Sequence, residues 1–245
     1  MTSFELLLVL SAVSGETPSC PLTDSAATAV VNQAEILRRE AQIDRARTLL
    51  EGARPCVSEG QLAYPVLLNN LAQIYKVTGP KKEVEPLLRA ALRAWQGTAF
   101  YDRGLANLGD WYQSRGESGR AEELYREVIE RQPRLPLHYN NLGLLLHRAR
   151  RHREAESSYR RAQELYQETG LPGAMQTWGN LGLLLLQRKR YGEAAAAFER
   201  MAEFTPLPVE EKGHAVYLEL YANLLRRGKI RRPPNARRHG RCGIA

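Results

Sequence analysis

Apolar and small residues recur at helical spacing near the end of the chain. In order, this stretch contains Trp178, Leu181, Gly182, Leu185, Ala194, Phe198 and Pro206. Its first apolar residues are three and four positions apart, so they share one face of a helix. Gly182 and Ala194 are small, which lets a second helix carrying Phe198 lie close to the first. Pro206 ends the unit, because proline cannot donate a helical hydrogen bond. The pattern therefore predicts a helical hairpin.

The same pattern recurs upstream at a period close to that of the 34-residue helical repeats. Each of four units contains a leucine that is followed directly by glycine or alanine. These leucines are Leu71, Leu108, Leu142 and Leu181, and successive ones are 37, 34 and 39 positions apart. A further, fainter unit precedes them and keeps only its small and apolar positions, Ala34, Leu37, Ala46, Leu50 and Ala53. Five units in register predict a protein built from stacked hairpins.

This spacing resembles the signature of the tetratricopeptide repeat, W-x2-L-G-x2-Y…A-x3-F…P, with Leu185 at the tyrosine position. The second unit reads N-N-L-A at 69–72 and E-P-L-L-R-A-A-L at 85–92, which resembles bacterial repeats of the kinesin-light-chain kind. The resemblance implies an all-α fold, a right-handed α-solenoid of helix-turn-helix repeats over residues 27–227.

We expect three regions in the chain. An N-terminal segment occupies residues 1–26, and within it residues 4–13 resemble the apolar part of a secretory signal that lacks the basic start. The alternative for residues 4–13 is a short apolar helix that covers the first repeat. The solenoid follows, with units at about 27–60, 65–98, 102–135, 136–169 and 175–208 and a terminal helix at 213–227. Residues 228–245 form a basic tail rich in Arg and Pro, which we expect to be disordered.

The cysteines leave the cellular compartment open. Cys20 and Cys56 flank the first repeat, and Cys242 lies in the tail. In an exported protein the first two can form a disulfide, whereas in a reducing compartment they are thiols. We expect a soluble protein and favour a cytoplasmic location over a periplasmic or exported one. No run of about 20 apolar residues occurs, so the sequence predicts no transmembrane helix.

The net charge of +8 belongs to the end of the chain. From Arg226 onward there are eight basic residues and no acidic one, so residues 1–225 hold 27 of each sign. A repeat body without net charge gives no reason to expect nucleic acid on its surface. The basic tail supports an alternative function, in which it attaches the chain to nucleic acid or to an anionic membrane.

The candidate site follows from the resemblance, which implies that first helices line a concave groove and that the residue before each leucine points into it. That position holds asparagine in all five units, Asn32, Asn70, Asn107, Asn141 and Asn180, although in the faint first unit glutamine stands where the leucine would follow. An asparagine both donates and accepts, so a row of them can bind the backbone of an extended peptide. The alternative is that these side chains cap local structure or meet water. Other polar residues surround the row: Asn69, Gln73, Lys76, Arg103, Asp110, Asn140, His147, Arg148, Gln187, Asn223, Arg226 and Arg227.

Catalytic patterns do not occur in the sequence. The motifs H-E-x-x-H, G-x-S-x-G and G-x-x-x-x-G-K-[ST] are missing, and the three cysteines have no zinc-binding spacing. We therefore expect no enzyme activity, no cofactor, no metal site and no small-molecule substrate. The sequence predicts a non-enzymatic scaffold that binds a peptide or partner protein in its groove.

Overall fold

The computed structural model describes residues 20–203, and within them it contains ten α-helices, one short 3-10 helix and no strand. The elements are α2 (Asp24–Arg39), α3 (Ile43–Ala53), η1 (Arg54–Cys56), α4 (Ala63–Thr78), α5 (Lys81–Ala94), α6 (Tyr101–Ser114), α7 (Ser118–Arg131), α8 (Pro136–Arg148), α9 (His152–Thr169), α10 (Ala174–Gln187) and α11 (Tyr191–Glu203). The predicted all-helical repeat fold is confirmed. The signal-like segment 4–13, the terminal helix 213–227 and the tail 228–245 lie outside the described residues.

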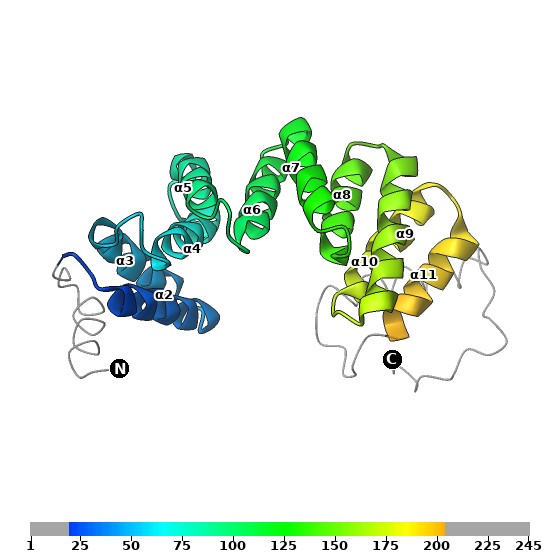
Figure 1. Ribbon diagram of the computed structural model, residues 1–245. Helices are drawn as coiled ribbons and strands as arrows, with labels where there is room; N and C mark the ends of the chain where they lie inside the picture. The colour runs from blue at the N-terminus through cyan, green and yellow to red at the C-terminus, as the bar shows by residue number, and fades with distance from the viewer. Residues whose placement is uncertain (1–19, 204–245) are drawn as a thin grey trace, which may run out of the picture. The chain divides into compact units, whose positions relative to one another are not determined.

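The described chain divides into two compact units, with the boundary after Gln132. The first unit contains α2 to α7 and the second contains α8 to α11. In both, each odd-numbered helix packs along the even-numbered helix that precedes it, which gives the hairpins α2/α3, α4/α5, α6/α7, α8/α9 and α10/α11 (Figure 1). We refer to the even-numbered member of each hairpin as its first helix.

Three hairpins share one packing contact, in which a glycine of the first helix faces an aromatic ring of the second. The pairs are Gly109 with Tyr125, Gly143 with Tyr159 and Gly182 with Phe198. A Cβ atom on Gly143 would lie only 2.7 Å from Cδ1 of Tyr159, so nothing larger than glycine fits without a shift. The close approach that the sequence predicts at Gly182 is therefore present, and it buries the rings in the core.

The turn inside most hairpins contains a residue in the left-handed backbone region. Its φ is +78° at Gly116, +59° at Ala41, +61° at Arg150 and +59° at Lys189. Glycine adopts this conformation without strain, whereas residues with a Cβ do so at a cost of about 1 kcal/mol. The three turns that lack glycine therefore depend on the packing of their helices.

The fainter first repeat forms a hairpin, and a covalent bond joins its two ends. Cys20, before α2, forms a disulfide with Cys56 at the end of η1, with 4.7 Å between the Cα atoms. Beside it, the backbone N–H of Leu22 donates to the carbonyl of Cys56 at 2.8 Å, and Gln61 Nε2 donates to the carbonyl of Leu22 at 2.8 Å. Of the two states that the sequence left open for this cysteine pair, the structure contains the disulfide.

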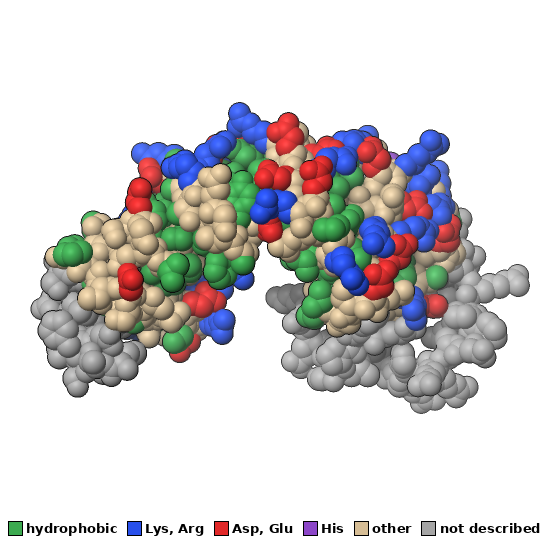
Figure 2. All heavy atoms as spheres, in the orientation of Figure 1, with side chains coloured by type: hydrophobic (Ala, Val, Ile, Leu, Met, Phe, Trp, Pro, Cys, Tyr) green, Lys and Arg blue, Asp and Glu red, His purple; other side chains and the backbone are tan. Residues whose placement is uncertain are grey.

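The surface carries charges of both signs. Figure 2 shows basic and acidic side chains interspersed on the visible face of each unit. Many of these charges pair along one helix, as Arg126 does with Glu122 at 2.7 Å. Between residues 20 and 203, no helix is long and apolar enough to cross a membrane.

Candidate peptide-binding face

The sequence-predicted groove residues that the structure describes lie on first helices, whereas Asn223, Arg226 and Arg227 fall outside the described residues. The described ones include Asn69, Asn70, Gln73 and Lys76 on α4, Arg103 and Asn107 on α6, Asn140, Asn141 and Arg148 on α8, and Asn180 on α10. The residues on α4 and α6 belong to the first unit, and those on α8 and α10 belong to the second unit. We call the side chains on α4 and α6, and separately those on α8 and α10, the first-helix face of each unit.

In the first unit, two asparagines connect adjacent first helices. Asn107 Nδ2 on α6 donates to Asn69 Oδ1 on α4 at 2.7 Å. Asn69 is only 7% exposed, and its own Nδ2 lies 3.5 Å from Asn70 Oδ1. Because a buried amide needs a partner, the pair fixes the spacing of α4 and α6 at this point.

The second unit repeats this contact with equivalent residues. Asn180 Nδ2 on α10 donates to Asn140 Oδ1 on α8 at 3.1 Å. The same oxygen accepts a second bond of 3.1 Å from the hydroxyl of Thr177, which is fully buried. The asparagine row does not predict Thr177 as a site residue, although Thr177 precedes Asn180 by three positions and therefore lies on the same helix face.

Part of the hydrogen-bonding capacity of the asparagine row remains available. Within residues 20–203, no group bonds to the side-chain oxygens of Asn107 and Asn180, and the Asn141 side chain makes no hydrogen bond. In Asn107 and Asn180 the side-chain nitrogen therefore has a local structural role. The side-chain oxygen of the same residue is the atom that the peptide-binding interpretation concerns.

The exposed members of the predicted site have no bonded partner among the described residues. Asn32, Arg103 and Arg148 are exposed, and they make no side-chain hydrogen bond or ion pair to any described residue. Their position on α2, α6 and α8 is compatible with a ligand, but no described side chain holds them in one orientation.

Two partly buried charges lie on the first-helix face of the first unit. Lys76 Nζ donates to Gln73 Oε1 at 3.3 Å, and Asp110 Oδ1 accepts from the hydroxyl of Tyr125 at 2.5 Å. Burial lowers the pKa of Lys76, and the charge of Asp110 opposes this effect. Burial also raises the pKa of Asp110, and the bond from Tyr125 and the charge of Lys76 oppose it.

The sequence predicts Asp110 only as one of the polar residues that surround the asparagine row, and it does not predict the bond from Tyr125. A recognisable signal was the spacing of three positions between Asn107 and Asp110, which places both on one helix face.

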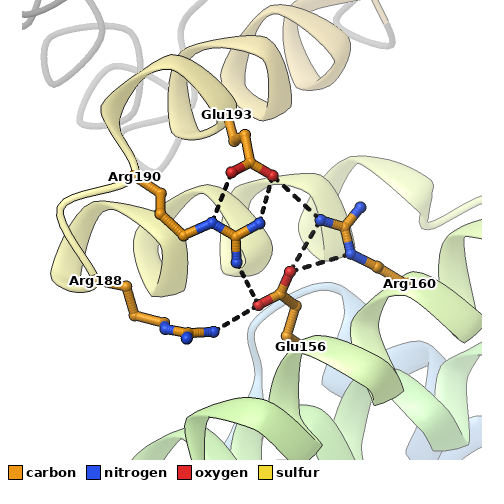
Figure 3. Close-up of polar contacts among 5 residues, drawn as sticks. All are labelled: Glu156, Arg160, Arg188, Arg190 and Glu193. Carbon is orange, nitrogen blue, oxygen red and sulfur yellow. Dashed lines mark hydrogen bonds and ion pairs between the residues drawn. The ribbon is translucent and has the colours of Figure 1, made fainter.

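In the second unit, polar residues also meet at the turn between α10 and α11. Glu156 on α9 accepts hydrogen bonds from Arg188 at 2.8 Å and from Arg190 at 2.7 Å (Figure 3). Both arginines lie in this turn. Arg160 and Glu193 complete the network. Burial alone would raise the pKa of Glu156, but the hydrogen bonds from Arg160 and Arg190 outweigh it and lower the pKa. This network joins α9 to the last described hairpin.

Histidines occur near the end of α8, without a metal-binding arrangement. His147 Nε2 lies 2.9 Å from Gln187 Oε1 on α10, and its ring lies 5.8 Å from the ring of His152. Within the part of the chain that the structure describes, no three His, Cys, Asp or Glu residues could hold a metal ion.

Two family models of the tetratricopeptide repeat match the chain, one over residues 105–137 and the other over residues 135–204. A search of curated proteins found no match. The helical hairpins described above therefore coincide with tetratricopeptide repeats from α6 to α11.

Solved structures extend this likeness to most of the chain. Pseudomonas aeruginosa pilF is 15% identical, with a TM-score of 0.62 over 83% of this chain and 92% of that chain. Kinesin-light-chain TPR-like repeats from Podospora anserina are 16% identical, with a TM-score of 0.61 over 74% of this chain and 95% of that chain. YrrB, described as a TPR protein with an unusual peptide-binding site, is 17% identical, with a TM-score of 0.52 over 78% of this chain and 90% of that chain. At these identities the likeness shows the fold, and the family models identify tetratricopeptide repeats within residues 105–204.

Proposed function

We propose that this chain is a non-enzymatic scaffold whose first-helix faces bind a peptide or an extended segment of a partner protein. The observation that carries the proposal is the incomplete use of the asparagine row. Asn107 and Asn180 each donate to a neighbouring first helix, while their oxygens remain without a partner in residues 20–203. A peptide backbone supplies N–H donors for such oxygens.

The fold supports the same proposal. Tetratricopeptide repeats generally form interaction surfaces rather than catalytic sites. One structural neighbour, YrrB, is described as having a peptide-binding site. A row of first helices offers many modest contacts along an extended ligand, which suits recognition of main chain over a demanding side-chain sequence.

A random peptide library displayed on phage, selected against the full chain, tests the proposal. The selected peptide is synthesised, and its affinity is measured by fluorescence anisotropy. Asn70 and Asn141 are suitable for substitution, because neither bonds to a neighbouring first helix. We expect Asn70→Ala or Asn141→Ala to weaken the peptide that binds its unit by about fivefold to tenfold, the effect of one hydrogen bond.

The matched control is Gln167→Ala, because Gln167 is an exposed amide on the second helix α9. It should leave the affinity unchanged. Failure to select any peptide, or equal binding by all the asparagine variants, would contradict the proposed function.

Two further measurements distinguish peptide binding from the alternative function, in which residues 228–245 attach the chain to nucleic acid or to an anionic membrane. Peptide binding on the first-helix face should survive deletion of residues 229–245 and change little between low and physiological salt. Binding through a basic tail to phosphate would be lost on deletion and would fall steeply with salt.

A further inference from the structure

Lys76 and Asp110 form an unusual pair on the first-helix face of the first unit. They lie on adjacent first helices, α4 and α6, and each side chain is partly buried. The Asn69–Asn107 hydrogen bond joins these two helices, and Lys76 and Asp110 lie on the same helix faces, seven and three positions further along. The charge of each residue also opposes the effect of burial on the pKa of the other. Within residues 20–203, however, neither residue takes part in an ion pair, so a gap separates ammonium from carboxylate.

Both charged groups retain unused hydrogen-bonding capacity. An ammonium has three donors, and Lys76 uses one of them, in the 3.3 Å contact with Gln73. A carboxylate has about four acceptor positions, and the described partner of Asp110 is the Tyr125 hydroxyl. Partly buried charges that lack a full set of partners destabilise the free protein, so a ligand that supplies those partners is bound favourably.

The opposite signs of the two groups restrict what that ligand can be. A carboxylate or phosphate would be attracted by Lys76 but repelled by Asp110. An ammonium group would be attracted by Asp110 but repelled by Lys76. A neutral group with one acceptor and one donor satisfies both residues. One residue of an extended peptide has this property, because its C=O and N–H point to the same side of the strand.

We propose that Lys76 and Asp110 together bind one residue in the interior of an extended peptide, with Lys76 donating to its carbonyl oxygen and Asp110 accepting from its N–H. This inference rests on the proposed function and adds to it a position and a kind of ligand. The pair recognises main chain away from either end of the peptide, and it does so between α4 and α6, beside the Asn69–Asn107 contact.

The test uses the peptide selected against the full chain and two variants that preserve side-chain shape. Lys76→Met keeps an unbranched side chain without the charge, and Asp110→Asn keeps an oxygen that can accept from Tyr125. Each should weaken binding by about tenfold or more, the effect of a charge-assisted hydrogen bond. The controls are Lys82→Met and Glu123→Gln, which remove exposed charges from the second helices α5 and α7. They should leave the affinity unchanged.

The same peptide, altered chemically, examines the ligand side of the contact. N-methylation of one interior residue should weaken binding to the wild type by about tenfold, and it should have little further effect in Asp110→Asn. Acetylation of the amino end and amidation of the carboxyl end should leave the affinity unchanged.

The outcomes distinguish the two proposals. If peptides bind but Lys76→Met and Asp110→Asn bind them as the wild type does, the inference is wrong and the proposed function stands. Loss of binding on blocking either end of the peptide also overturns the inference. If no peptide is selected, both proposals fail.

Discussion

Asn107 donates a 2.7 Å hydrogen bond from α6 to the side-chain oxygen of Asn69 on α4. Asn107→Ala removes the donor and leaves a nearly buried oxygen without its partner. We expect a loss of about 1 kcal/mol in the free energy of unfolding, measured by urea denaturation. Asn70→Ala should cost less, because the only hydrogen bond of the Asn70 side chain among the described residues is the 3.5 Å contact from Asn69. Equal losses in the two variants would show that the Asn107–Asn69 bond is not what stabilises this position.

The contact of Gly143 with Tyr159 should be sensitive to a single methyl group. A Cβ atom at Gly143 would lie 2.7 Å from the ring, so Gly143→Ala should lower the free energy of unfolding by about 1–3 kcal/mol. Gly192 lies on α11 with nothing within 4 Å of an added Cβ, so Gly192→Ala should be neutral or stabilising. Thermal denaturation compares the two variants. A stable Gly143→Ala protein would mean that Tyr159 moves aside freely.

These glycine contacts belong to the part of the fold that the sequence predicts well. Leucine-glycine pairs and aromatic residues recur in the sequence at fixed spacing, because each hairpin solves the same packing problem. The structure confirms the consequence at Gly182 and Phe198, where the small residue and the ring meet as expected.

The candidate site is predicted less completely. The sequence identifies Asn107 and Asn180 as polar residues of the groove, but their bonds to Asn69 and Asn140 depend on the spacing of neighbouring first helices. That spacing is set by residues distant in sequence. The Glu156 network is missed for the same reason, since two of its three arginines, Arg188 and Arg190, come from another hairpin.

Glu156 should stabilise the second unit in a pH-dependent manner. It accepts hydrogen bonds from three arginines, so Glu156→Gln should cost about 1–2 kcal/mol of unfolding free energy. Because its pKa is lowered in the folded chain, its contribution is present above its unfolded pKa of about 4.3 and is lost as pH falls through the folded value. Urea denaturation at neutral and acidic pH measures both effects. Glu123→Gln is the control, and a pH dependence identical in both variants would argue against the network.

Glu35 offers a direct measurement of one ion pair in the first unit. The hydrogen bond from Arg38 is the largest cause of its shift and, with help from Arg39 and against burial, lowers the pKa of Glu35 to about 2. A carboxyl NMR titration should find this midpoint in the wild type. In Arg38→Met the pKa should rise toward the ordinary value of about 4.3. Arg93→Met, which removes an exposed charge from α5, should not move it. An ordinary pKa for Glu35 in the wild type would show that the Arg38 bond does not persist in solution.

The bond between Cys20 and Cys56 should stabilise the first hairpin selectively. Replacing both cysteines by serine should cost about 2–4 kcal/mol, because the unfolded segment then regains its conformational freedom. Hydrogen exchange should increase in α2 and α3 and change little in α8 to α11. Cys242→Ser is the control, and unchanged exchange in α2 and α3 would contradict the prediction.

This disulfide also changes what a protease can do to the protein. The two cysteines are 36 positions apart, and α2 and α3 both lie between them. A cut at the turn around Ala41 therefore breaks the chain but does not separate its pieces. Nicked molecules would migrate at full size on a non-reducing gel and divide into two fragments only after reduction. The first repeat can thus be cleaved and still remain attached to the helices that follow it.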